Sequence, residues 1–354
     1  MTATILGLDA LLREVAATAA EVDSGRANVD RHVRVVAASG VFDGELDALL
    51  ARDPSATDVR GSAGVIADLA TECLPTSFGS WAHRMTADYL ARGEQTAATS
   101  EALAALRSGT AIGATGMAQG LKSLAGLGEV GITATPDAGG YRIDGTIGWI
   151  SNLGQDAIVV LPAVTPSGEG LVAWAPLSAP GITARRICGL LALDATASGS
   201  LRLSGLHIPA DQVLSHDLPG FARGFKRAFL ILQTSFALGL IRRARIEIEG
   251  ALDRGENAVF GGEAARLGGH VDEFTETWNR LAADVGRYDV REYLDIRLEV
   301  SRLAQRATRL ELTLAGGRGY QVAAGANRRF REAAFLPVQS PSEGHLLWEL
   351  SSLG

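Results

Sequence analysis

Apolar residues recur with a helical period near both ends of the chain. The N-terminal stripe begins with Leu8, Leu11, Leu12 and Val15. Such spacing places the side chains on one face of a helix. A second stripe, with spacings that alternate between three and four residues, predicts one long helix of a helical bundle. Its members are Tyr293, Ile296, Val300, Leu303, Ala307, Leu310 and Leu314.

The pattern between these helical regions favours strands. From Gly109 to about Asp217 the chain has short runs of Gly, Thr, Val and Ile, separated by turn segments such as PDAGG and TPSGEG. The runs that predict strands are Val130–Thr135, Tyr141–Thr146, Ile158–Ala163, Leu171–Ala175, Ile182–Arg186 and Ser200–Ile208. This middle region is therefore expected to be all-β.

A chain of 354 residues exceeds what one hydrophobic core usually organises. We expect a mostly α, α+β protein with three domains. These are an N-terminal helical domain at 1–108, a middle antiparallel β-barrel or sandwich at 109–217, and a C-terminal four-helix bundle at 218–354. The apolar run Ala228–Ile241 has 14 residues, fewer than the ~20 that span a bilayer, and predicts a buried helix.

Composition and charge exclude several function classes. The net charge of -7 argues against nucleic acid as a main partner, because phosphate binding needs a basic face. Cys73 and Cys188 lie far apart and have no metal-ligand spacing, which favours a reduced, intracellular setting. The first residues carry charges at Asp9, Arg13 and Glu14, so no signal-peptide core is present. We expect a cytoplasmic protein without a metal site.

Two motifs about 170 residues apart carry candidate chemistry. The first, Tyr141–Asn152 (YRIDGTIGWISN), predicts a strand, a glycine turn and a second strand. On a strand, Trp149 and Ser151 share a face. The second, Gly316–Glu332 (GGRGYQVAAGANRRFRE), is a glycine-rich loop that closes the long helix and leads into a segment rich in arginine.

In this order the two motifs resemble the flavin-flanking motifs of the acyl-CoA dehydrogenase superfamily. The resemblance implies a helix–sheet–helix-bundle fold and bound FAD, with FMN or reduced flavin supplied by a partner as alternatives. It implies that Trp149, Ile150 and Ser151 lie beside the flavin ring, where the serine hydroxyl stabilises charge near N5. A structural alternative is a core tryptophan with a solvent-facing serine. The glycines implied to lie near the cofactor are Gly316, Gly317 and Gly319.

Two further segments resemble cofactor-contacting parts of the family. The loop Gly113–Gly126 takes the place of a segment against flavin and substrate, so Thr115 and Gly116 keep part of that role; a flexible surface loop is the alternative.

The segment ENAVFG, which includes Phe260, resembles a Glu-Arg-x-x-Phe-Gly motif whose arginine reaches the FAD pyrophosphate of a neighbouring subunit. Asn257 replaces that arginine, and Arg254, about one helical turn earlier, could substitute for its charge. The alternative is that this segment is only a helix end.

The catalytic base of the family is changed in this chain. Ser340 occupies the ungapped position of the glutamate that removes the α-proton, and a serine needs a partner to act as a base. Glu343 lies three residues later and is the candidate base, with His345 as a second acid–base candidate. Ser340-Pro341-Ser342-Glu343 also predicts a capping box with Ser340 as N-cap. An alternative base position on an earlier helix holds Lys226, which we interpret as a solvated charge.

Three functions are compatible with these residues. The first is α,β-dehydrogenation of an acyl thioester or related small molecule by a flavin-dependent oxidoreductase. The second is a flavin monooxygenase on the same scaffold, which needs no glutamate. The third is a non-catalytic partner subunit of a hetero-oligomeric enzyme, which Asn257 favours. The resemblance implies a homodimer or homotetramer, with a hetero-oligomer as the alternative.

Overall fold

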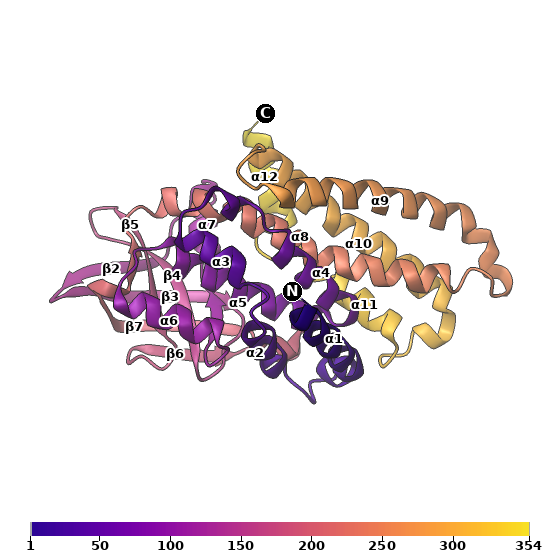
Figure 1. The fold of residues 1–354 in the computed structure, drawn as a ribbon, viewed down its shortest axis with the longest axis horizontal. Helices are drawn as coiled ribbons and strands as arrows, with labels where there is room; N and C mark the ends of the chain where they lie inside the picture. The colour runs from indigo at the N-terminus through magenta and orange to yellow at the C-terminus, as the bar shows by residue number, and fades with distance from the viewer. Residues whose placement is uncertain (1, 354) are drawn as a thin grey trace.

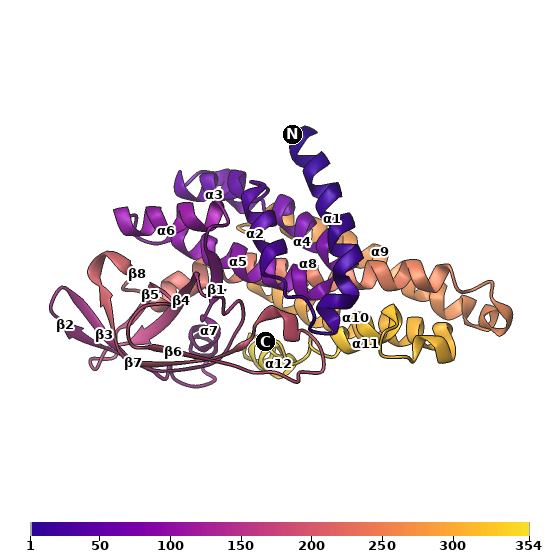
Figure 2. The same cartoon turned by 90° about the horizontal axis from the view of Figure 1, so that it is seen from below.

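The computed structural model describes residues 2–353; Met1 and Gly354, the outer ends of the first and third predicted domains, lie outside the described residues. Helices form both ends of the described chain, and strands form the middle (Figure 1). The sheet lies at one end of the molecule, α9 and α10 extend to the other, and the N-terminal helices cover the region between them (Figures 1 and 2).

Helices fill the N-terminal region as the apolar stripe predicted. They are α1 (Thr2–Asp23), α2 (Asp30–Ala38), α3 (Asp43–Leu50), α4 (Arg60–Glu72), α5 (Leu74–Arg92) and α6 (Ala97–Arg107). Helix α5 is the central one, because every residue from Leu74 to Ala91 is buried. It packs against α4, α8 and strand β1, so its polar side chains must find partners inside the protein.

One mixed sheet occupies the middle region. Its strands are β1 (Ile112–Thr115), β2 (Ile132–Asp137), β3 (Gly140–Ile150), β4 (Ala157–Val164), β5 (Gly170–Pro176), β6 (Ile182–Arg186), β7 (Gly199–Pro209) and β8 (Val213–Ser215). The order is β6-β7-β3-β2-β4-β5-β8, with β1 paired to β4. Most pairs are antiparallel, as predicted, but β4 pairs in parallel with β1 and β2.

Two features of the middle region differ from the sequence prediction. The segment predicted as a loop, Gly113–Gly126, contains most of β1 and helix α7 (Ala118–Leu124). Both elements are short and contain a glycine, so the sequence pattern did not predict a strand or a helix there. The predicted glycine turn inside Tyr141–Asn152 is wrong, because β3 runs through Gly145 as one strand. Gly145 has φ +150 and marks an irregularity in the pairing with β7, where a Cβ would lie 2.6 Å from the Gly131 carbonyl oxygen.

The C-terminal helices are α8 (Leu218–Glu249), α9 (Gly261–Ala283), α10 (Val290–Gly319), α11 (Gly325–Ala333) and α12 (Glu343–Ser352). The predicted buried helix is the middle of α8, and the predicted bundle helix is α10. By length and composition α8 resembles a membrane span, but most of its apolar window is buried inside the protein, as in a core helix. Gly316, with φ +60, interrupts α10 near its end, as expected for a closing glycine.

Candidate active site

The end of β3 presents an aromatic ring beside a group of hydroxyls. Trp149 is 60% exposed, whereas Ile150 next to it is in the core, so only the backbone of Ile150 is available to a ligand. Ser151 Oγ lies 2.8 Å from Ser198 Oγ, and Ser198 Oγ lies 2.8 Å from Thr196 Oγ1. The structure therefore rules out the core-tryptophan alternative, and it places Ser151 in a hydroxyl network.

Asn152 fixes this end of β3 to the helical core. It adopts a left-handed φ of 63, and its buried Nδ2 donates to the carbonyl oxygens of Gly79 and Gly113, each at 2.9 Å. The Gly113 N–H in turn donates to Nδ1 of His83 at 3.1 Å. Burial lowers the pKa of His83 to about 4, which keeps the ring neutral and able to accept. Asn152 and His83 hold β3 and β1 together, and sequence reasoning missed both.

Thr115 ends β1, and Gly116 follows it directly. The Thr115 hydroxyl lies 3.2 Å from the Tyr89 hydroxyl, and its side chain is partly exposed. A Cβ on Gly116 would lie 2.8 Å from the carbonyl oxygen of Val160 and 2.9 Å from Ile147 Cδ1. The small size of Gly116 is thus required by packing between strands, and Thr115 is the residue of this pair with a side chain available to a ligand.

An open pocket of about 650 Å³ lies between α8, the end of α10 and the start of α11. Five arginines and three glutamates line it, so positive charge exceeds negative charge. Among the described residues Arg254 and Arg318 have no acidic partner, whereas Arg243 and Arg329 pair with glutamates. Gly319 and Gly325 bring the backbone to the pocket wall. The pocket suits a ligand with anionic groups.

Asn257 is near this pocket, but its amide is engaged elsewhere. Asn257 lies in the short 3-10 helix Gly255–Phe260. Its Nδ2 donates to the carbonyl oxygens of Ala251 and Leu314, at 3.0 and 3.1 Å. A phosphate would compete with these bonds. Phe260 is partly buried and packs against the core. Gly316 and Gly317 are open, because no described atom lies within 4 Å of the place that a Cβ would take at either glycine.

The arginine and glutamate of Gly316–Glu332 have structural partners in this chain. Arg331 forms an ion pair with Asp23, with 2.5 Å between Nη2 and Oδ2, and also donates to the Leu191 carbonyl oxygen. Glu332 is buried, and burial raises its pKa to about 7. Arg331 therefore joins α11 to α1 and to the loop before β7.

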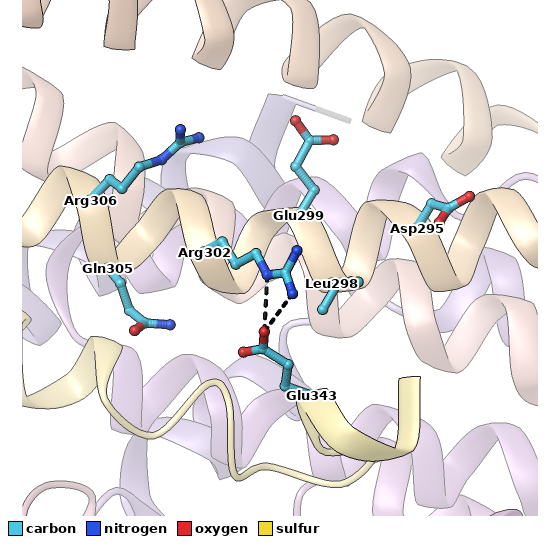
Figure 3. Close-up of a pocket in the computed structure, with 7 residues that line it drawn as sticks. All are labelled: Asp295, Leu298, Glu299, Arg302, Gln305, Arg306 and Glu343. Atoms are coloured by element: carbon cyan, nitrogen blue, oxygen red, sulfur yellow. Dashed lines mark hydrogen bonds and ion pairs between the residues drawn. The ribbon is translucent and has the colours of Figure 1, made fainter. Parts of the chain in front are cut away.

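Glu343, the candidate base, faces an open pocket on α10 and is held by an arginine. Arg302 Nε and Nη2 both donate to Glu343 Oε1, at 2.9 and 2.7 Å (Figure 3). The predicted capping box is wrong in its register. Ser342, and not Ser340, is the N-cap of α12, and its Oγ accepts the His345 N–H at 3.3 Å. The Ser340 carbonyl oxygen accepts instead from Gln233 on α8.

A buried charged cluster lies on the inner side of α12. Lys226 on α8 pairs with Glu349, and His345 Nε2 lies 2.9 Å from Glu349 Oε1. The interpretation of Lys226 as a solvated charge is therefore wrong: α12 covers it and supplies a carboxylate. Although burial opposes ionisation, bonds from His345 and Lys226 lower the pKa of Glu349. Glu349 was missed, although its spacing of four residues from His345 on a predicted helix was a usable signal.

The structure links this cluster to the β1–α7 segment. Trp348 Nε1 donates to the carbonyl oxygen of Ala125 at 3.0 Å, so α12 lies beside the end of α7. Lys226 follows Phe225, whose ring lies 4.6 Å from that of Tyr89, the partner of Thr115. Thr115 and the inner face of α12 are thus joined through Tyr89 and α8.

The comparisons with known proteins agree with this architecture. No family model matches the chain. The bovine mitochondrial short-chain specific acyl-CoA dehydrogenase is 27% identical over 251 residues, which cover 62% of this chain and 59% of that protein. Butyryl-CoA dehydrogenase from Megasphaera elsdenii superposes with a TM-score of 0.88 at 17% identity, over 99% of this chain and 96% of that one. The FAD complex of PigA superposes with a TM-score of 0.82 at 15% identity, over 99% and 97%.

The fold is that of the acyl-CoA dehydrogenase superfamily, as the sequence predicted. Together with the match to the bovine enzyme, it supports the interpretation of this chain as a divergent member of that superfamily. The sequence match covers less than two thirds of that relative's length, so the activity and ligands of this chain are matters for proposal.

Proposed function

We propose that this chain is a flavin-dependent oxidoreductase of the acyl-CoA dehydrogenase type. The observation that carries the proposal is the exposed ring of Trp149 beside the Ser151, Ser198 and Thr196 hydroxyls. A large aromatic surface next to hydrogen-bond donors fits a planar, polar-edged ring system. The flavin, when bound, accepts the hydride.

The residues of this chain fit that cofactor at two places. Trp149 would stack on the ring face, and Ser151 would donate a hydrogen bond toward the ring edge, where negative charge develops. The arginine-lined pocket would offer Arg254 and Arg318 to a diphosphate group, which the family resemblance assigns to the FAD of a neighbouring subunit. FAD has such a group and is the cofactor we propose, as in the PigA complex. FMN is the smaller alternative.

Proton removal from the substrate is assigned to His345, with Glu343 as the alternative. His345 is buried against α8, its Nε2 lies 2.9 Å from Glu349 Oε1 in an ion-pair contact without hydrogen-bond geometry, and its Nδ1 has no partner among the described residues. Glu343 must leave Arg302 before it can act, and it faces the open pocket of Figure 3. A base backed by a carboxylate is a recurrent catalytic arrangement. The substrate class is an acyl thioester or a related small molecule.

A monooxygenase on the same scaffold is the second candidate, because the ungapped base position holds Ser340, which cannot take a proton alone.

The deciding experiment mixes the flavin-loaded chain with butyryl-CoA without oxygen. Bleaching of the flavin absorbance supports the dehydrogenase. No bleaching, together with oxygen incorporation from supplied reduced flavin, supports the monooxygenase. Failure of both reactions contradicts the proposal for these substrates.

A further inference from the structure

Arg297 on α10 is a fully buried cation whose partners are all neutral. Its Nε donates to Gln233 Oε1 at 3.1 Å, and its Nη2 donates to the Leu336 carbonyl oxygen at 3.1 Å and to Gln339 Oε1 at 2.6 Å. Its Nη1, which carries two N–H groups, has no partner in the described part of the chain. Among residues 2–353 no carboxylate forms an ion pair with it.

The other buried cations of the described chain are all neutralised. Arg84, as deeply buried as Arg297, contacts Glu45 at 3.0 Å and Asp88 at 3.3 Å. Arg329 pairs with Glu311, and Lys226 pairs with Glu349. Wherever else the described chain buries a whole lysine or arginine side chain, it therefore provides a carboxylate, as the cost of an uncompensated buried charge requires. Arg297 is the exception.

No carboxylate within residues 2–353 is placed to serve Arg297. Glu343 is the acidic group that interacts electrostatically with Arg297. Its carboxylate, however, accepts two hydrogen bonds from Arg302, on another face of α10. Burial without a counterion lowers the pKa of Arg297 to about 10, which still leaves it charged near neutral pH. The positive charge is thus present and unbalanced in the folded protein.

Two buried hydroxyls also lack partners among the described residues, one on α10 with Arg297 and one on the chain neighbour of its partner Gln339. Ser301 lies one helical turn further along α10, and its Oγ has none. Ser340 Oγ has none either, while its carbonyl oxygen accepts from Gln233, the partner of Arg297 Nε. Buried polar groups are almost always satisfied in folded proteins, so several orphaned donors around one unbalanced cation point to a missing acceptor.

We propose that the junction of α8, α10 and segment 336–340 is a binding site for one small anion, a halide or a carboxylate, held by Arg297 Nη1 and the hydroxyls of Ser301 and Ser340. The anion supplies the negative charge that no carboxylate of the described chain provides to Arg297. It also accepts hydrogen bonds from the N–H and O–H groups that have no other partner. The site does not depend on a flavin. Because Ser340 borders it, an anion there lies beside the segment that precedes His345.

The test is thermal unfolding of the full chain at fixed ionic strength, with sodium sulfate replaced stepwise by sodium chloride, formate or acetate. Because sulfate stabilises folded proteins non-specifically, each Tm is compared with that of Arg297→Met in the same salt, and relative to that variant we expect a saturable rise of roughly 2–4 °C in the wild type. Arg306→Gln removes an exposed arginine from the same helix and should show the same rise. Arg297→Met should show none. Equal effects of chloride and carboxylates indicate a free inorganic ion, and an effect of carboxylates alone indicates an organic acid or a substrate carboxylate.

A second measurement keeps the proposal testable if Arg297→Met does not fold. Wild-type crystals grown in bromide, or in formate, should show anomalous scattering or a planar ligand within hydrogen-bond distance of Arg297 Nη1. Water at that place in both crystals, or a rise in Tm that is identical in Arg297→Met and wild type, would overturn the anion site.

Discussion

The end of β3 and the inner face of α12 differ in how their functional groups are engaged. At β3 the Trp149 ring is exposed and Ser151 contacts only other hydroxyls. At α12 the carboxylates of Glu343 and Glu349 already have cationic partners, Arg302 and Lys226. The proposed ring-binding side is therefore open to a ligand, whereas both carboxylates at the proposed proton-handling side are already paired with cations.

The largest effect should come from His345. In the flavin-loaded chain, His345→Gln is expected to slow anaerobic bleaching by butyryl-CoA by about 10²–10⁴-fold, because it removes the general base. Glu343→Gln is the matched control and should change the rate only slightly, since it breaks a partly exposed ion pair. Rapid-mixing absorbance measures both rates. A large loss of bleaching rate in Glu343→Gln, with no loss in His345→Gln, would identify Glu343 as the general base.

Trp149 tests the other side of the comparison. Trp149→Ala should weaken flavin binding by about 10–100-fold, as expected when a stacking aromatic is removed. Trp149→Phe, which keeps a ring, should lose less. Because the side chain is 60% exposed, the free energy of unfolding should hardly change. Equilibrium dialysis with FAD measures the affinity. If Trp149→Ala binds FAD with wild-type affinity, the Trp149 ring is not part of the cofactor site.

The arginine-lined pocket distinguishes FAD from FMN. The double variant Arg254→Gln and Arg318→Gln should weaken FAD binding by about 10-fold, because two charges near a diphosphate are lost. FMN affinity should stay unchanged, since FMN has no diphosphate. Arg302→Gln serves as a control for net charge. Equal losses for both flavins would place the pocket outside the cofactor site.

His83 supports the β3 end from behind and should make stability depend on pH. Its folded pKa of about 4 lies below the value of 6.5 expected in the unfolded chain. The unfolded chain therefore binds the proton first, and stability falls as pH decreases from 6.5 toward 4, by roughly 1–3 kcal/mol. Urea unfolding across this range measures the slope. His83→Gln should flatten it, and an unchanged slope would assign the acid sensitivity to another group.

Long periodic patterns predicted the fold well. The apolar stripe of α10 and the apolar middle of α8 identified both helices, because each pattern extends over several turns. Short elements failed: β1, α7 and the bulged course of β3 depend on tertiary pairing that glycine-rich sequence does not specify. The N-cap of α12 is Ser342, and the Ser340 carbonyl oxygen instead accepts a long-range hydrogen bond from Gln233 that the local sequence does not indicate.

The candidate site was predictable only where a residue carries a local motif. Trp149, Ser151 and the glycines at the end of α10 were singled out by their spacing in the sequence. Asn152, His83 and Arg297 act through contacts with residues far away in the chain, at separations that no local pattern records. Lys226 was misjudged for the same reason, because the helix that buries it lies more than a hundred residues later.

The measurement that tests the account most directly is the visible spectrum of the purified chain, together with the identity and amount of the cofactor it releases. The account predicts flavin bound near one molecule per chain, released as FAD, or stoichiometric uptake of FAD added to the chain. A colourless protein that takes up neither FAD nor FMN would contradict the proposed function, and Trp149 would then be an exposed aromatic with another role.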